Sequence, residues 1–170
     1  MTALEKVRFL KEIKWNKLYL DKYFIDISVE ENRWQPGEID ELQQQYPWLS
    51  QFYLDFIAEF DAVGVAWVVF YGSRNCDVIP IWEEIDYWKD QAKDQYLPFG
   101  KDPSGSIYVF DRQNKVLLFS LDDEEWENPE VHADSLEEFI DQCLLGPQYA
   151  EFNSIEKDNF YRLLKDQGWV

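Results

Sequence analysis

The spacing of apolar residues predicts amphipathic helices at several places along the chain. Residues 3–20 carry apolar side chains at roughly helical intervals, and the stretch from about Ser50 repeats the pattern of a buried helical face. The first set is Leu4, Val7, Leu10, Ile13 and Leu18, and the second is Tyr53, Phe56, Ile57 and Phe60. Further helices are expected between Pro36 and Pro47, over 82–94 and over 154–166.

Runs of β-branched and aromatic residues predict the strands. Residues 65–71 contain no charged side chain, so we expect one strand there, covered on both faces. Two later runs, 106–111 and 115–121, flank Asn114, and asparagine tolerates the positive φ that a tight hairpin turn requires. We therefore expect a hairpin at Asn114 and a short strand within 23–29.

Ser135 and Glu138 form the sequence pattern of a capping box, in which each side chain binds a backbone N–H at the start of a helix. The helix is expected to run from Leu136 to Leu145, because Gly146 and the following proline end it.

The chain is strongly acidic. Its 170 residues include 34 Asp and Glu but 16 Lys and Arg, for a net charge of −18, and residues 1–33 alone have a net charge of +1. Such a balance disfavours nucleic acid and anionic membrane surfaces as partners and favours basic proteins. The length suits one domain whose core needs no metal or disulfide. With no signal-peptide pattern and no long apolar run, we expect a cytoplasmic protein.

The residues that common catalytic sites require are scarce. His132 is the only histidine, and a lone histidine near a helix start is far more often a surface or capping residue than a catalyst. Residues 100–106 lack the lysine of a phosphate-binding loop, and residues 122–130 lack the ligand spacing of a calcium loop. With 34 acids, no single carboxylate pair is informative. We therefore expect no enzyme, no catalytic residue, no metal site and no cofactor.

Four stretches follow one another in an order known from one family. They are GEIDELQQQYPWLSQFYLDFIAEFDAVGV at 37–65, VAWVVFYGS at 65–73, YLPFGKDPSGSIYVFDRQNKVLLFSLDDEE at 96–125 and ADSLEEFI at 133–140. Over roughly residues 36–145 this order resembles the SUKH superfamily, the Smi–Knr family. Residues 101–105 depart from the family pattern by having fewer glycines.

The resemblance implies a single α+β domain, with a mainly antiparallel β-sheet and helices packed against it. Residues 1–35 would form an N-terminal helical extension, 36–147 the SUKH-like domain, and 148–170 a C-terminal helix packing on the same domain. Bacterial members are largely immunity proteins that bind partner toxins, often nucleases, and fungal members regulate cell-wall synthesis through protein contacts. The family has no established catalytic residues.

Residues 122–141 contain ten acidic and no basic side chains. Such a surface suits a basic partner, for example a toxin domain whose cleft normally holds phosphates. We predict a non-enzymatic immunity-type protein that binds and neutralises a partner toxin through this surface. The predicted partner-binding residues are Asp122, Asp123, Glu124, Glu125, Trp126, Glu127 and Glu130.

Other hypotheses fit the same residues. A merely solvated loop and helix face would carry the same charge, and a regulatory adaptor would use the same surface without a toxin. A small-ligand binder or an unrecognised enzyme is also open, and a deep pocket with converging polar groups would favour it.

Overall fold

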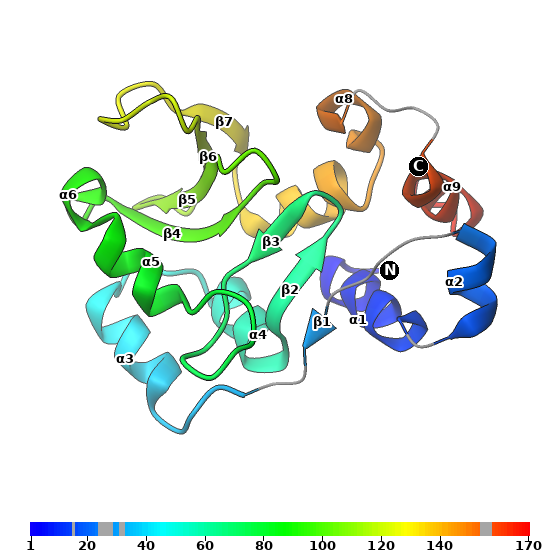
Figure 1. Ribbon diagram of the computed structural model, residues 1–170, viewed down its shortest axis with the longest axis horizontal. Coiled ribbons are helices and arrows are strands. Elements are labelled where there is room, and N and C mark those ends of the chain that lie inside the picture. The colour runs from blue at the N-terminus through cyan, green and yellow to red at the C-terminus, as the bar shows by residue number, and fades with distance from the viewer. Residues whose placement is uncertain (15, 24–28, 31–32, 154–157) are drawn as a thin grey trace.

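The structure is a computed structural model that describes residues 1–14, 16–23, 29–30, 33–153 and 158–170 (Figure 1). Its helices are α1 (Ala3–Ile13), α2 (Lys17–Tyr23), α3 (Glu38–Gln45), α4 (Gln51–Glu59), α5 (Ile81–Tyr87), α6 (Lys89–Ala92), α7 (Leu136–Glu138), the π-helix η1 (Phe139–Leu144), α8 (Tyr149–Asn153) and α9 (Asn159–Asp166). Its strands are β1 (Val29–Glu30), β2 (Asp61–Val65), β3 (Val68–Phe70), β4 (Tyr96–Lys101), β5 (Ile107–Asp111), β6 (Val116–Phe119) and β7 (Glu130–Ala133).

Within the described residues, the strands form one antiparallel sheet in which each strand pairs with the next along the chain, in the order β1 to β7. Leu97 of β4 lies opposite Phe110 of β5, and Val109 of β5 lies opposite Leu117 of β6. Antiparallel neighbours need only short connections, as between β2 and β3 and between β5 and β6, whereas α3 and α4 lie between β1 and β2, and α5 and α6 between β3 and β4. The predicted α+β class with a mainly antiparallel sheet is confirmed.

The centre of the sheet, at β5, is covered on both faces. On one face Tyr108 and Phe110 enter the main core, where the ring of Tyr53 from α4 lies 4.9 Å from that of Phe110. On the other face Val109 enters a second cluster together with Phe119. Successive side chains of a strand point to opposite faces, so β5 is apolar at consecutive positions because both faces are covered.

Residues 65–71 form a hairpin, so the predicted single strand is wrong. β2 ends at Val65, Ala66 adopts a φ of 54°, and Val65 pairs with Val68 at the start of β3. Hairpin turns of this kind usually contain glycine, asparagine or aspartate. The turn residues here are Ala66 and Trp67, so the sequence contains no turn signal between the two strands. Trp67 therefore lies at the tip of this hairpin.

The other predicted elements agree in part. The helix expected over 3–20 is divided into α1 and α2, and the one expected over 82–94 is divided into α5 and α6 at Trp88. The helix predicted from Ser50 is α4, whose first turn donates the N–H of Tyr53 to Ser50 Oγ at 3.3 Å. Most of the strand predicted within 23–29, and residues 154–157 of the last predicted helix, lie outside the described residues.

Ser135 caps α7 as predicted. Its Oγ accepts the N–H of Glu138 at 3.1 Å, but the Glu138 carboxylate accepts the N–H of Asp134 at 2.9 Å in place of that of Ser135, so only half of the predicted capping box forms. Beyond Glu138 the chain continues as the π-helix η1 up to Leu144. The predicted α-helix over 136–145 is thus one α-helical turn followed by a π-helix.

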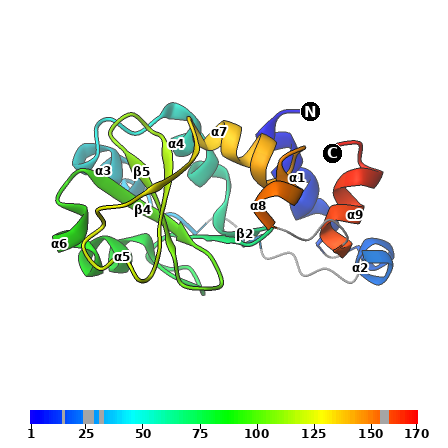
Figure 2. The same cartoon turned by 90° about the horizontal axis from the view of Figure 1, so that it is seen from above.

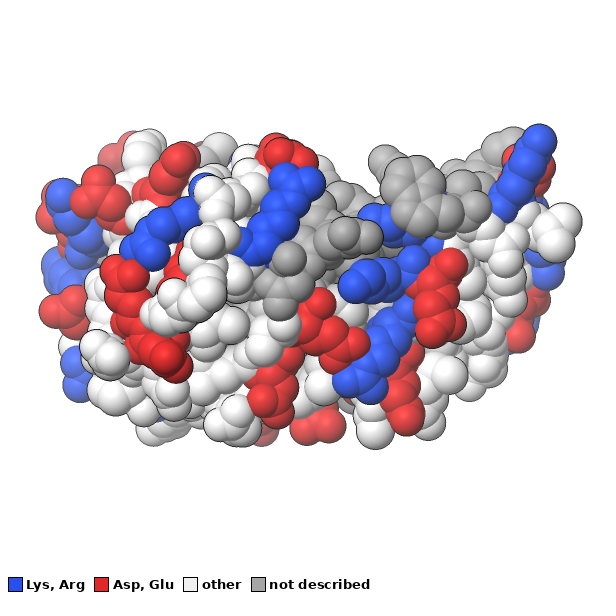
Figure 3. Space-filling model, turned by 90° about the horizontal axis from the view of Figure 1, so that it is seen from below, with Lys and Arg blue, Asp and Glu red and all other residues white. Residues whose placement is uncertain are grey.

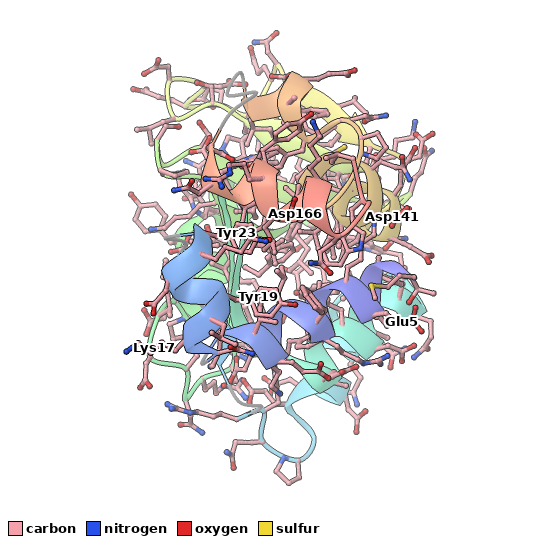
Figure 4. The ribbon with its side chains drawn as sticks, turned by 90° about the vertical axis from the view of Figure 1, so that its right-hand side faces the viewer. Glu5, Lys17, Tyr19, Tyr23, Asp141 and Asp166 are labelled. Carbon is pink, nitrogen blue, oxygen red and sulfur yellow. The ribbon has the colours of Figure 1, made fainter. Side chains whose placement is uncertain are left out.

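Helices from the two ends of the chain lie together at one end of the molecule, away from α3, α5 and α6 (Figures 1 and 2). There Asp166 of α9 accepts hydrogen bonds from Tyr23 Oη at 2.6 Å and Lys22 Nζ at 2.8 Å, and Figure 4 shows Tyr23 and Asp166 facing each other. Leu10 of α1 and Leu163 of α9 belong to the same core as the sheet. Both terminal helices therefore pack on the sheet domain.

Candidate functional site

The acidic loop, residues 120–129, connects β6 to β7 through two consecutive turns. The N–H of Asp123 binds the Ser120 carbonyl at 2.9 Å. The Asp123 carboxylate in turn accepts the N–H groups of Glu127 at 3.1 Å and Asn128 at 2.8 Å. An aspartate that binds backbone groups a few residues ahead stabilises a turn, so the loop holds its own conformation.

Trp126 points inward from the acidic loop and is only 5% exposed. Its indole stacks on Phe119 with ring centroids 4.9 Å apart and an interplanar angle of 8°, and it lies 5.2 Å from Trp88. The φ of Trp126 is 54°, a left-handed value that β-turns accept. This residue, which we predicted to meet a partner, instead anchors the loop to the sheet.

The predicted carboxylates lie on the outside of this anchored loop. Asp123 is half-buried, and the exposed carboxylates of the loop are Asp122, Glu124, Glu125 and Glu127, while Glu130 is exposed at the start of β7. From Val116 to Glu156 the sequence contains no Lys or Arg. By contrast, Figure 3 shows a face on which Lys and Arg side chains lie beside Asp and Glu side chains. The acidic loop therefore presents charge of a single sign.

A pocket of about 580 Å³ lies next to this loop, bounded by the β2–β3 turn, the β4–β5 turn, β7 and α8. Its aromatic wall consists of Trp67, Tyr108, His132 and Phe152. The Trp67 indole N–H donates to Tyr108 Oη at 2.9 Å, and the rings of His132 and Phe152 lie 4.8 Å apart. Burial raises the pKa of the Tyr108 hydroxyl, which therefore stays neutral.

His132 is a buried member of this aromatic wall, so its interpretation as a surface or capping residue is wrong. Its side chain is 5% exposed, and neither ring nitrogen has a hydrogen-bond partner among the described residues. Glu130 Oε1 lies 3.4 Å from His132 Nε2, within ion-pair distance but without hydrogen-bond geometry. Burial lowers the pKa of His132, so the imidazole is neutral at neutral pH.

Three carboxylates line the pocket, and no Lys or Arg does within the described part of the chain. Glu130 and Glu151 are exposed at its edge. Asp102 Oδ1 accepts the N–H groups of Ser104 at 2.8 Å and Ser106 at 3.0 Å, so residues 102–106 form the β4–β5 turn. With a neutral His132, the lining carries an excess of negative charge.

The arrangement offers hydrogen-bond acceptors and aromatic surface rather than an activated nucleophile. The thiol sulfur of Cys143 lies 3.7 Å from the backbone carbonyl oxygen of His132, and burial raises the pKa of Cys143 to about 12. Across the described ranges, no three His, Cys, Asp or Glu side chains are grouped so as to hold a metal ion. The pocket is therefore suited to binding a positively charged group.

Sequence reasoning missed most of this pocket. Only Glu130 was among the predicted binding residues, because Trp67, Tyr108 and Phe152 come from segments far apart in the chain. One pattern in the sequence could have indicated part of the pocket. Alternate residues of a strand lie on the same face, so a strand over 130–133 places Glu130 and His132 side by side.

No family model matches the sequence, and no curated protein matches it either. None of the helices in the described residues is long and apolar enough to cross a membrane.

Proposed function

We propose that this chain is a non-enzymatic, immunity-type protein that binds a basic protein partner through the acidic loop and neutralises it. The order of sequence motifs that resembles the SUKH superfamily supports this function. So does the antiparallel sheet flanked by helices, which is the architecture that the resemblance implies.

The observation that carries the proposal is the inward anchoring of Trp126 beneath outward-facing carboxylates. The indole stacks on Phe119, and Asp123 binds the backbone of its own loop, so the exposed acids stand on a structured support. A preorganised surface loses little conformational entropy when it binds, and that loss otherwise reduces affinity.

The charge of the loop predicts how binding proceeds. Complementary charges raise the association rate roughly 10- to 1000-fold, and salt removes this gain. The Debye length falls from about 10 Å at 0.1 M salt to about 3 Å at 1 M, so the effect is measurable within an ordinary range of buffers.

The test begins with affinity capture of the partner from native lysate and its identification by mass spectrometry. Stopped-flow association is then measured at low and high salt for the wild type and a loop variant. The loop variant carries Asp122→Asn, Glu124→Gln, Glu125→Gln and Glu127→Gln. Asp123 is kept because its carboxylate holds the turn together.

A control variant removes the same number of charges from exposed positions of α1, α2, α3 and α4, with Glu12→Gln, Asp21→Asn, Asp40→Asn and Asp55→Asn. We expect the loop variant to associate at least about tenfold more slowly at low salt and to lose most of its salt dependence. The control variant should retain both. Equal association rates for the wild type and the loop variant would reject the proposal.

Two alternatives have distinct tests. A regulatory adaptor would use the same loop, and a toxin gene beside this one in the genome favours immunity over that role. The pocket at His132 favours a second candidate function, binding of a small ligand, because polar groups converge there on an aromatic wall. A free metabolite that raises the melting temperature and binds more tightly than the protein partner would favour this second function.

A further inference from the structure

We infer that the pocket between Trp67 and His132 receives the cationic head group of an arginine or lysine side chain from the basic partner. The inference rests on the proposed function, because the partner supplies the side chain. The acidic loop attracts the partner, and the pocket holds one of the partner's side chains in place.

The charge of the lining selects a cation. Asp102, Glu130 and Glu151 contribute carboxylates, and no basic side chain of the described residues lines the pocket. An anionic group would be repelled by all three, whereas a cation gains attraction from all three in a concave, partly desolvated space.

The aromatic wall favours the same group. A cation within about 6 Å of an aromatic face is attracted by the ring quadrupole, most strongly by tryptophan and more often as arginine than as lysine. Trp67 and Phe152 lie nearly parallel, with ring centroids 6.4 Å apart and an interplanar angle of 21°. The pocket, at about 580 Å³, is large enough for a complete side chain.

His132 brings a buried imidazole to the pocket wall, and neither of its nitrogens has a hydrogen-bond partner among the described residues. The neutral imidazole has one nitrogen with a free lone pair. A buried polar group without a partner is costly, so a ligand N–H that reached it would recover that cost. Glu130 Oε1 is 3.4 Å from Nε2, so the carboxylate lies beside the imidazole and accepts the N–H groups of a cation that packs against the ring. The planar guanidinium carries several such donors in fixed directions, which makes arginine the better fit.

The position of the pocket ties it to the acidic loop. Glu130 is the first residue of β7 and directly follows the loop, while its side chain lines the pocket. A partner attracted by the loop thus brings its basic side chains to the mouth of the pocket. In protein interfaces, an arginine that fills such a pocket often carries much of the binding energy.

The test uses N-acetyl-arginine amide as the probe and the full chain labelled with ¹⁵N in its tryptophan indoles. The indole N–H resonance of Trp67 is followed during titration at moderate salt. N-acetyl-citrulline amide, which has nearly the same shape but no charge, is the matched neutral probe, and N-acetyl-lysine amide tests the ammonium group.

Two variants accompany the titration. The pocket variant carries Glu130→Gln and Glu151→Gln, both exposed side chains, so it is expected to fold. The control variant carries Glu12→Gln and Glu137→Gln, which remove the same charge elsewhere.

We expect the arginine probe to shift the Trp67 resonance saturably and the citrulline probe to leave it unchanged. The pocket variant should bind the arginine probe roughly two- to tenfold more weakly, and the control variant should match the wild type. Equal shifts with both probes, or no saturable shift with arginine, would overturn the inference.

The captured partner separates this inference from the proposed function. If the loop variant slows association while the pocket variant leaves the dissociation rate unchanged, the function stands and the anchor role fails. If the loop variant associates like the wild type, the proposed function itself fails.

Discussion

The ammonium group of Lys6 lies 2.8 Å from Asp141 Oδ1 and joins the N-terminal helix to the π-helix. The same group donates to the backbone carbonyls of Asp141 at 3.1 Å and of Leu145 at 2.8 Å. Carbonyls at the end of a helix lack partners within the helix, and Lys6 supplies hydrogen bonds to two of them. Its ammonium group therefore has acceptors around it, although Lys6 is only 6% exposed. This contact attaches α1 to the segment that follows β7 and its pocket.

Replacing Lys6 with methionine keeps most of the apolar stem of the side chain and removes its donors. We expect Lys6→Met to reduce the free energy of unfolding by about 1–3 kcal/mol, because the carbonyls and the Asp141 carboxylate lose their partner. Urea denaturation measures the change. Lys17→Met, at an exposed position of α2, is the control and should stay within about 0.5 kcal/mol of the wild type. Equal denaturation midpoints for the two variants would contradict the capping role.

Trp126→Ala tests whether the acidic loop is anchored from within. Removing an indole that stacks on Phe119 should cost about 3–5 kcal/mol of stability, since it leaves a cavity in the second cluster. Thermal or urea unfolding measures this cost. Leu121→Ala, in the same loop but 58% exposed, should change stability little. A fully stable Trp126→Ala protein with weakened partner binding would instead make Trp126 a direct contact.

The buried imidazole of His132 predicts a pH dependence of stability. Burial lowers the pKa of His132 below its ordinary value of 6.5, so below that pH the unfolded chain binds more protons than the folded one. The wild type should therefore lose stability relative to His132→Gln as the pH falls from 6.5 toward the lowered pKa. Above that window the difference between the two proteins should be constant.

Unfolding free energies of the wild type and His132→Gln, measured at several pH values between about 5 and 8, check this prediction. Comparing the two proteins cancels the contribution of the carboxylates that do not contact His132, because these titrate in both. Parallel curves over the whole range would mean that His132 titrates alike in the folded and unfolded chain.

Cys143 should resist alkylation in the folded protein. Burial raises the pKa of Cys143 to about 12, and its Sγ donates to Gln148 Oε1 at 3.3 Å. The thiolate is the reactive form, so iodoacetamide at about pH 8 should modify Cys143 only as fast as the chain opens. Mass spectrometry of the peptide containing Cys143 follows the reaction, with urea-unfolded protein as the positive control. Rapid modification in native buffer would show that the segment around η1 opens readily.

Local chemistry was enough to predict several elements. Ser50 and Ser135 cap helices because a serine hydroxyl satisfies a backbone N–H two or three residues ahead, wherever the helix lies in the fold. Asn114, at a φ of 62°, makes the turn between β5 and β6 for an equally local reason. The acidity of 122–130 and its exposure follow from charges that water solvates better than a core does.

The elements that were predicted wrongly depend on distant contacts. Ala66 adopts a positive φ in the turn between β2 and β3, and the pairing of β3 with β4 holds these strands in place. Alanine has no local preference for such a turn, so the turn could not be predicted from the neighbouring residues. Similarly, η1 departs from α-helical geometry next to Lys6, which binds its carbonyls from 135 residues away in the sequence.

The sequence by itself determined that this chain forms an acidic α+β domain with helix starts and a hairpin at particular residues, because caps, turns and apolar periods act over a few neighbouring positions. Only the tertiary structure decided that Trp126 faces inward and that His132 is buried beside Glu130 and Trp67. The direction of a side chain in a loop or strand depends on which face finds apolar partners. Those partners come from segments that meet only after the sheet has formed, so the pocket has no signature in any one stretch of sequence.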